Sequence, residues 1–303
     1  MSTTRLSFGI KTTPMRVGYD DIVRVWREAD EIEELEHAWL WDHFLPLFAP
    51  PTVPVLEGWT LLAALAAQTE RLGVGLLVTN NAARPPAVLG KMAATTDVIS
   101  HGRLVLGLGV GGTRQPDSVD NSPAIAEFAA YGLPLRAPAE GIARLVETVT
   151  TIRRMWADDQ PFDVDGRFDR LQGLVCEPKP VQRPGPPLLL GGWGDRMLRV
   201  VAEHADIWNM PGPPHNPVAH LVERSRALDR HCAAIGRDPA ALTRSTQVLV
   251  GVDDVAAIRD ALVELVREGF THIVLAPMPP YPEKVARRLV DEIVLPVREL
   301  VSA

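Results

Sequence analysis

Short apolar runs alternate with longer amphipathic segments along almost the whole chain, and this rhythm constrains the fold more than any other feature. Short runs that are apolar throughout predict strands covered on both faces, as in a parallel sheet. The predicted strands are Leu6–Ile10, Trp39–Trp41, Leu72–Thr79, Leu104–Gly109, Pro187–Gly191, Ile207–Met210, Thr246–Val250 and His272–Ala276. Eight strands are the number that a closed (β/α)8 barrel requires.

Each predicted strand is followed by a segment whose apolar residues recur at three- and four-residue spacing, which predicts a helix. The predicted helices are Asp20–Glu36, Trp59–Glu70, Ala87–Ser100, Ala139–Trp156, Arg196–Glu203, Pro217–Ile235, Val255–Arg267 and Tyr281–Val294. A chain of 303 residues has the length of one α/β barrel, and no linker interrupts the alternation. We therefore expect a single domain over residues 1–303.

Two longer segments interrupt the rhythm and are predicted to be insertions. Gly111–Pro138 follows the fourth strand, and Asp158–Pro186 precedes the fifth. Long insertions in a compact domain are usually lids or binding loops. The first begins at the C-terminal end of a strand, which is the end where barrel enzymes assemble their active sites.

Composition and charge exclude several classes of protein. The net charge is −7 and no long basic run is present, so nucleic acid is an unfavourable partner. The two cysteines, Cys176 and Cys232, and the eight histidines lack metal-type spacing, so no metal site is predicted. The sequence has neither a signal-peptide pattern nor an apolar run long enough to span a membrane, which predicts a cytoplasmic protein.

The segment Trp41-Asp42-His43-Phe44 ends the second predicted strand, so Asp42 and His43 are expected at the mouth of the barrel. A carboxylate beside a histidine can orient the ring and raise its basicity, which gives a group able to exchange a proton near neutral pH. We predict that His43 and Asp42 are catalytic. The alternative is an aspartate that caps the next turn and a histidine that serves packing.

Two glycine-rich segments follow predicted strands. Leu106–Thr113 lacks the order of glycines that binds dinucleotides, and it is better suited to close backbone approach to a flat ring or a phosphate. Leu188–Asp195 leads into a helix whose free backbone N–H groups could bind an anion. Asp195 could instead cap that helix.

Several blocks in order resemble the luciferase-like monooxygenase family, in particular its deazaflavin (coenzyme F420) subgroup. They are Leu40–Phe44, Trp59–Arg71, Arg84–Asp97, Ile99–Gly109, Tyr131-Gly132, Pro187–Gly192 and Ala205–Asn209. The resemblance covers nearly the whole chain. It implies a (β/α)8 TIM barrel of the bacterial-luciferase-like type that holds a flavin or deazaflavin at the C-terminal mouth of its strands.

The resemblance also implies which residues bind the cofactor. Asp42 and His43 would lie at its ring, and Leu76-Leu77 would form a bulge against the ring face, with a non-prolyl cis peptide in the F420 subgroup. The ring and its arm would be flanked by Thr79, Val110, Gly111 and Gly112, and the phosphate by Gly191, Gly192 and Trp193. Sugar-phosphate dehydrogenases of the subgroup have a glutamate where this chain has Gly112-Thr113, so the loop Gly111–Ser122 is expected to define another substrate pocket.

These features favour an F420-dependent oxidoreductase that transfers a hydride between the deazaflavin and a small organic substrate. The alternatives are a monooxygenase that uses FMNH2 from a separate reductase, and a non-catalytic flavin-binding protein, because one fold serves several chemistries. The resemblance implies a homodimer formed through helices near the second and third strands. The apolar stretch Trp59–Ala67 could contribute to that interface or belong to the core.

Overall fold

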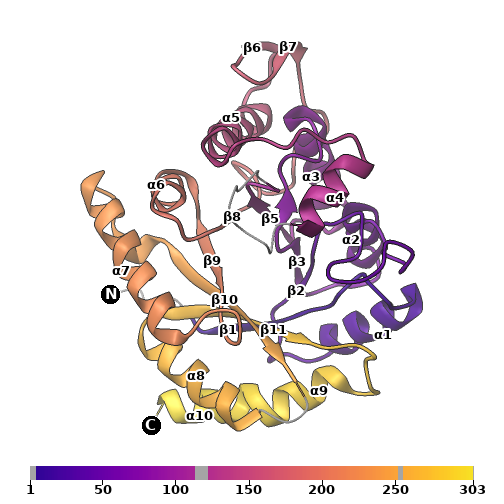
Figure 1. The fold of residues 1–303 in the computed structure, drawn as a ribbon, viewed down its shortest axis with the longest axis vertical. Coiled ribbons are helices and arrows are strands. Elements are labelled where there is room, and N and C mark those ends of the chain that lie inside the picture. The colour runs from indigo at the N-terminus through magenta and orange to yellow at the C-terminus, as the bar shows by residue number, and fades with distance from the viewer. Residues whose placement is uncertain (1–4, 113–121, 252–254, 303) are drawn as a thin grey trace.

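The chain folds into a closed parallel β-barrel surrounded by helices, and the computed structural model describes residues 5–112, 122–251 and 255–302 (Figure 1). The barrel strands are β1 (Ser7–Lys11), β2 (His37–Leu40), β3 (Gly73–Leu76) with its continuation β4 (Thr79–Asn80), β5 (Leu104–Gly109), β8 (Leu188–Gly191), β9 (Ile207–Pro211), β10 (Thr243–Val250) and β11 (Phe270–Pro277). The order is β3-β2-β1-β11-β10-β9-β8-β5, and pairing of β3 with β5 closes the ring. The eight predicted strands are confirmed, with ends shifted by a few residues.

Side chains on the barrel strands alternate between the helical layer and the barrel interior. On β5, for example, Leu104, Leu106 and Leu108 belong to the large core between strands and helices. A separate small cluster inside the barrel contains Trp39, Leu189 and Val274. Each strand is therefore covered by apolar side chains on both faces. This is why the strand sequences are continuous apolar runs.

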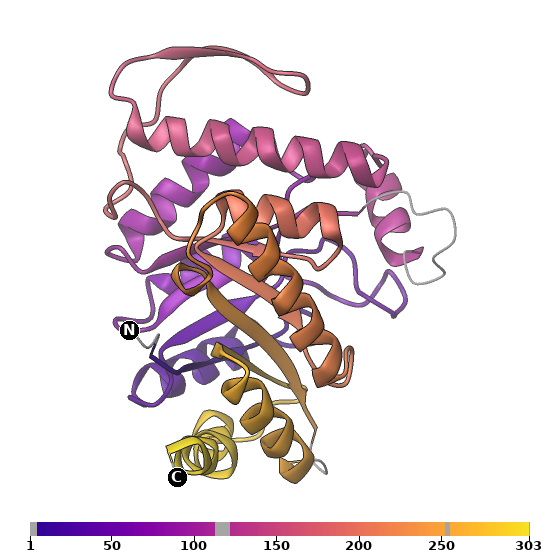
Figure 2. The same ribbon diagram turned by 90° about the vertical axis from the view of Figure 1, so that its left-hand side faces the viewer.

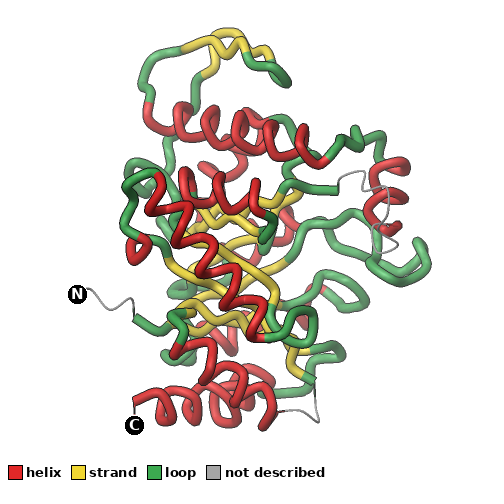
Figure 3. Tube along the Cα trace, turned by 60° about the vertical axis from the view of Figure 1, so that its left-hand side comes forward, coloured by secondary structure: helices red, strands yellow, loops and turns green. Residues whose placement is uncertain are grey.

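Helices pack around the outside of the barrel strands (Figure 3). They are α1 (Tyr19–Asp30), α2 (Gly58–Ala66), α3 (Pro86–Ile99), α5 (Pro138–Ala157), α6 (Asp195–His204), α7 (Val218–Ala234) and α8 (Val255–Arg267), followed by α9 (Val285–Leu289), the π-helical turn η3 (Val290–Val294) and α10 (Leu295–Ser302); a 3-10 turn, η2 (Pro239–Ala241), precedes β10. Every predicted helix is present. The last one begins four residues later than predicted and continues to Ser302.

Both predicted insertions contain secondary structure that the sequence analysis missed. The first includes the helix α4 (Ser122–Ala130), and the second includes the antiparallel hairpin of β6 (Phe162–Asp165) and β7 (Arg170–Leu174). The hairpin projects beyond α5, on the side of that helix away from the barrel (Figure 2). Much of the loop predicted to define the substrate pocket, residues 113–121 including Thr113, lies outside the described residues.

Cys176 and Cys232 are free thiols that are buried in the hydrophobic core. Within the described ranges, no helix has both the length and the apolarity needed to cross a bilayer.

Candidate active site

A cavity of about 360 Å³ opens at the C-terminal ends of the barrel strands. Its lining brings together every residue predicted to bind the cofactor except Leu76. The lining residues are Asp42, His43, Leu77, Val78, Thr79, Asn80, Gly109, Val110, Gly111, Gly112, Glu127, Gly191, Gly192, Trp193, Asn209, Pro211 and Gln247. Leu76 lies in the core outside the barrel, because consecutive residues of a strand face opposite sides.

Backbone without side chains forms much of the cavity wall. A Cβ placed on Gly191 would lie 3.2 Å from Val78 Cγ1, and Gly192 has a φ of +132°, a conformation that other residues rarely adopt. These glycines therefore keep space free for a flat group. Trp208 Nε1 also donates a hydrogen bond of 2.7 Å to the Gly192 carbonyl oxygen, which fixes this part of the backbone.

Five of the polar side chains that line the cavity are buried: Asp42, Thr79, Asn80, Glu127 and Asn209. Among the described residues, Thr79 Oγ1 has no hydrogen-bond partner although it is fully buried. The Asn209 amide donates to Ser245 Oγ at 2.9 Å, which fixes its orientation. An orphaned hydroxyl of this kind is costly unless a ligand supplies its partner. The glycine-lined space and the Thr79 hydroxyl fit the ring system of a flavin or deazaflavin.

Asp42 does not orient His43, so the predicted pairing of these two side chains is wrong. Arg84 holds Asp42 in a bidentate ion pair, with N–O distances of 2.7 and 3.0 Å. The backbone N–H of Asn80 donates to the same carboxylate at 2.9 Å. Arg84 also pairs with Glu57 at 2.5 Å. Asp42 thus ties the end of β2 to the segment after β4, and this fixes the chain on both sides of the cavity.

His43 is instead oriented by Glu127, which comes from α4. Glu127 Oε2 lies 3.1 Å from His43 Nδ1, and Glu127 Oε1 accepts hydrogen bonds from the backbone N–H groups of Phe44 and Leu45. Burial alone would raise the pKa of the Glu127 carboxyl, but the His43 contact and these N–H donors hold it below its ordinary value. An ionised carboxylate only accepts, so Nδ1 carries the proton of a neutral His43 ring.

This arrangement leaves His43 Nε2 as the ring nitrogen available for chemistry. The His43 side chain is 29% exposed and lines the cavity, whereas Glu127 is buried. Among the described residues, Nε2 has no hydrogen-bond partner. Trp41 packs edge-on against the ring, with centroids 5.2 Å apart, and limits its rotation. His43 is therefore the best-placed acid–base group of the cavity.

Glu127 is the residue of the candidate site that sequence reasoning missed. Its segment, Ser122–Ala130, is a short apolar stretch with one acidic residue, and α4 packs its apolar Phe128 inward beside Glu127. A single carboxylate in an otherwise apolar helix was the available signal. Its partner at Nδ1 lies 84 residues away, which no local pattern reveals.

The cis peptide bond that the family resemblance implies occurs one position later than predicted. The non-prolyl cis peptide joins Leu77 to Val78, not Leu76 to Leu77. Leu77 and Val78 both line the cavity, and Leu77 also packs in the small cluster inside the barrel.

The segment predicted to meet a phosphate lies at the rim. Gly191, Gly192 and the 41% exposed Trp193 precede α6, whose N-cap is Gly194. Asp195 does not cap this helix. It is the first helical residue, and its carboxylate pairs with Arg224 at 3.1 Å.

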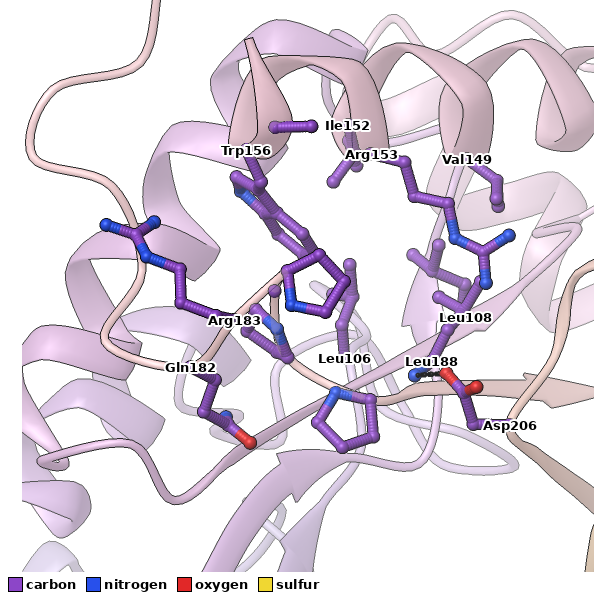
Figure 4. Close-up of a pocket in the computed structure, with 15 residues that line it drawn as sticks. Leu106, Leu108, Val149, Ile152, Arg153, Trp156, Gln182, Arg183, Leu188 and Asp206 are labelled. Carbon is purple, nitrogen blue, oxygen red and sulfur yellow. Dashed lines mark hydrogen bonds between the residues drawn. The ribbon is translucent and has the colours of Figure 1, made fainter. Parts of the chain in front are cut away.

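A larger cavity, of about 710 Å³, lies outside the barrel between α5 and the segment 182–188 (Figure 4). It is lined by Trp156 and Ile152 of α5 and by Leu106, Leu108 and Leu188, whose side chains face the helical layer. This cavity does not belong to the barrel mouth.

In the part of the chain that the structure describes, no group of three or more His, Cys, Asp or Glu side chains could hold a metal ion.

Comparison with known proteins decides the family. The protein-family model described as luciferase-like monooxygenase matches residues 2–290 of the chain. The chain belongs to this family. This confirms the family predicted from the sequence and the oxidoreductase class.

Other members of the luciferase-like family show similarity in sequence. The chain is 28% identical over 267 residues to a phthiodiolone/phenolphthiodiolone dimycocerosates ketoreductase from Mycobacterium sp. (strain JLS), across 78% of this chain and 66% of the relative. Matches to ketoreductases of the same description cover between 48% and 66% of the relatives' own length.

Solved structures of the luciferase-like type confirm the barrel. An F420-dependent secondary alcohol dehydrogenase, solved with an F420-acetone adduct, superposes with a TM-score of 0.81 at 15% identity, covering 98% of this chain and 99% of that one. A monooxygenase from Streptomyces bottropensis superposes with a TM-score of 0.73 at 22% identity, over 96% and 99% of the two chains. At these identities the likeness shows the fold alone.

Proposed function

We propose that the chain is a coenzyme F420-dependent oxidoreductase that interconverts a ketone and a secondary alcohol. The observation that carries the proposal is His43, which lines the glycine-walled cavity with Nδ1 fixed by Glu127 and with Nε2 unpaired among the described residues. The names of the ketoreductase relatives support carbonyl chemistry. The fold that the chain shares with an F420-dependent alcohol dehydrogenase is consistent with the same cofactor.

Four side chains at or beside the cavity have a part in this reaction. The bound deazaflavin would supply or accept the hydride at the carbon of the substrate. During reduction the protonated His43 ring donates its Nε2 proton to the carbonyl oxygen and is left neutral with its proton on Nδ1, and during oxidation the neutral ring accepts that proton at Nε2. Glu127 holds the tautomer that this requires, and Asp42 with Arg84 fixes the strand end that carries His43.

The cofactor residues proposed here divide into two groups by their position. Leu77, Thr79 and Val110 lie where a ring would sit, beside His43 and Asp42, and Gly111 and Gly112 extend that wall. Gly191, Gly192 and Trp193 are the proposed phosphate contacts, at the start of α6 where free N–H groups favour an anion.

A second candidate is a monooxygenase that uses FMNH2 from a separate reductase. It is favoured by the description of the family and by the fold shared with the Streptomyces enzyme. Fluorescence titration with oxidised F420 and with FMN distinguishes the two. We expect tighter binding of F420. Tighter binding of FMN, with oxygen consumption once FMN is reduced, would replace our proposal with the monooxygenase, and binding without any turnover would favour the non-catalytic alternative.

The role of His43 is tested by His43→Ala. An acid–base group contributes about 10²–10⁴-fold, so single-turnover hydride transfer should slow by that order while F420 affinity changes little. His231→Ala, on the outer helix α7, is the matched control. If His43 serves only packing, the variant will melt at a lower temperature and transfer hydride at the normal rate.

The homodimer stays a proposal. Trp59, Leu62 and Leu65 of α2 are buried within the chain, so the apolar stretch is explained by the core alone. Sedimentation at micromolar concentration decides the oligomeric state. The cytoplasmic location also stays a prediction.

A further inference from the structure

A second cavity at the barrel mouth, of about 670 Å³, lies beside the candidate active site. It is enclosed by the C-terminal ends of β1, β2, β10 and β11 and by the loops that follow β2 and β11. Its lining residues are Lys11, Thr12, Thr13, Met15, Arg16, Trp41, Leu47, Phe48, Leu249, Ala276, Pro277, Met278, Pro279 and Pro280. These residues take no part in the proposed function, apart from Trp41, which packs against His43.

Two contacts join this cavity to the active site. Trp41 lines the second cavity while its ring packs edge-on against His43. Lys11, also in the second cavity, donates through Nζ to Gln247 Oε1, and Gln247 lines the active-site cavity. A smaller cavity between them, of about 340 Å³, is lined by residues of both, among them Lys11 and Gln247. The three spaces are therefore adjacent, because each shares lining residues with the next.

The walls of the second cavity are apolar, and their polar groups are largely paired already. Trp41 Nε1 donates to Thr13 Oγ1 at 3.0 Å, and the Thr13 backbone N–H donates to the Tyr281 hydroxyl at 2.7 Å. At the outer rim, Phe48 is 80% exposed and Met278 is 59% exposed. Large apolar side chains left open around a concave surface indicate a binding site for apolar groups.

Charge further restricts what the cavity can accept. Its two ionisable side chains, Lys11 and Arg16, are both cationic, and its described lining residues include no carboxylate. Burial lowers the pKa of Lys11 to about 8. A cationic ligand would be repelled here, and its buried charge would have no partner.

From this arrangement we propose that the second cavity binds the hydrocarbon part of a neutral substrate, so that the substrate is a ketone or secondary alcohol with a long or bulky apolar substituent. The inference rests on the proposed function, because it places the reacting oxygen at His43. The polar groups at the inner end, Lys11 and Gln247, give such a molecule one orientation. Its oxygen faces the active site and its chain extends over Phe48 and Met278.

Binding of 2-alkanones, from 2-butanone to 2-undecanone, tests the proposal by calorimetry, with and without F420. A buried methylene contributes about 0.8 kcal/mol, so affinity should rise about fourfold for each methylene that enters the cavity. Met278→Glu places a carboxylate at the apolar rim and should weaken binding of 2-undecanone at least tenfold, with a smaller effect on 2-butanone. Leu300→Glu, at a 47% exposed position of α10, should change neither.

Affinity that is independent of chain length, or unchanged by Met278→Glu, overturns the inference. Melting temperatures of both variants verify that they are folded. The outcome is separable from the proposed function, because ketone binding needs no turnover. Graded ketone binding in a protein that does not bind F420 would reject the cofactor and leave the apolar site standing. F420-dependent turnover of short ketones without a chain-length effect would do the opposite.

Discussion

Glu127 and His43 are 84 residues apart in the sequence, yet Glu127 Oε2 lies 3.1 Å from His43 Nδ1. The contact connects α4, which lies in an insertion, to the end of β2. An element that the sequence analysis leaves as a loop thus determines which nitrogen of the histidine faces the cavity.

Replacing Glu127 by glutamine should reduce turnover. In Glu127→Gln the side-chain amide oxygen can still accept from Phe44 and Leu45, but the NH2 group then faces His43 Nδ1 and favours the opposite tautomer. We expect kcat to fall about 10²-fold, the lower end of an acid–base contribution, with KM little changed. The pH–rate profile should also shift, which a purely structural role would not cause. Glu140→Gln, in an exposed pair with Arg167, is the control.

Adding a methyl group at Gly191 should weaken cofactor binding. The new Cβ would enter the cavity 3.2 Å from Val78 Cγ1, at a position whose backbone conformation alanine can adopt. Overpacking costs about 1–3 kcal/mol, which corresponds to a rise of roughly 5- to 150-fold in the dissociation constant. Gly194→Ala is the matched control, because a Cβ there meets nothing within 4 Å. Gly192 is a poorer choice, since its φ of +132° would strain any variant. Equal affinity in both alanine variants would place the cofactor elsewhere.

Removing Arg84 should destabilise the fold. Arg84→Met leaves the buried Asp42 carboxylate without its bidentate partner, and breaking a buried pair in this way costs about 3–5 kcal/mol. Urea unfolding should show the loss, and Arg84→Met combined with Asp42→Asn should recover part of it. Arg288→Met removes the exposed pair with Glu292 and should cost less than about 1 kcal/mol. Similar losses in both single variants would contradict the role given to Asp42.

Stability should fall in mild acid because of two histidines inside the barrel. His37 and His272 stack with centroids 3.9 Å apart, and burial lowers the pKa of His272 to about 4. The unfolded chain binds protons at these sites below about pH 6.5 while the folded chain does not, so stability is complete above that pH and declines as the pH falls towards 4. For His272 alone, the shift of the pKa from about 6.5 to about 4 corresponds to a loss of about 3 kcal/mol in the free energy of unfolding.

The variant His272→Asn tests this contribution. It removes the titrating ring, while its amide can still reach Ser245 Oγ, which now lies 2.8 Å from His272 Nδ1. The free energy of unfolding should then depend less on pH between 7 and 4 than in the unmodified chain. His231→Asn on α7 should leave the dependence unchanged. An identical pH dependence in all three proteins would mean that other groups cause the acid lability.

The barrel could be predicted from the sequence because each strand is buried on both faces. Segments outside the barrel, which are not buried on both faces, were harder to recognise. In β7 (Arg170–Leu174), no residue is buried. The hairpin that β7 forms with β6 carries charged side chains, so its sequence resembles that of a loop. The end of β11 was accurate to one residue, since its pattern is apolar to the last position.

The candidate site was predicted in location but not in its internal contacts. Glycines and the segment Trp41–Phe44 mark the strand ends, and these meet at one edge because the strands are parallel. Which side chains pair there depends on residues from distant elements. Asp42 and His43 are consecutive, so their side chains diverge, and each finds a partner that comes later in the chain.

The apolar cavity and the glycine-walled cavity are separate spaces at the mouth, and this separation has a consequence for the evolution of the protein. The apolar cavity is built largely from the loop after β2 and the segments that follow β1 and β11, whereas the glycine wall comes from β5 and β8. Mutations in the former group can alter the accepted molecule without touching the latter. If Met278–Pro280 and the neighbouring residues are exchanged between homologues, substrate preference should therefore be transferred with them, while the cofactor stays the same.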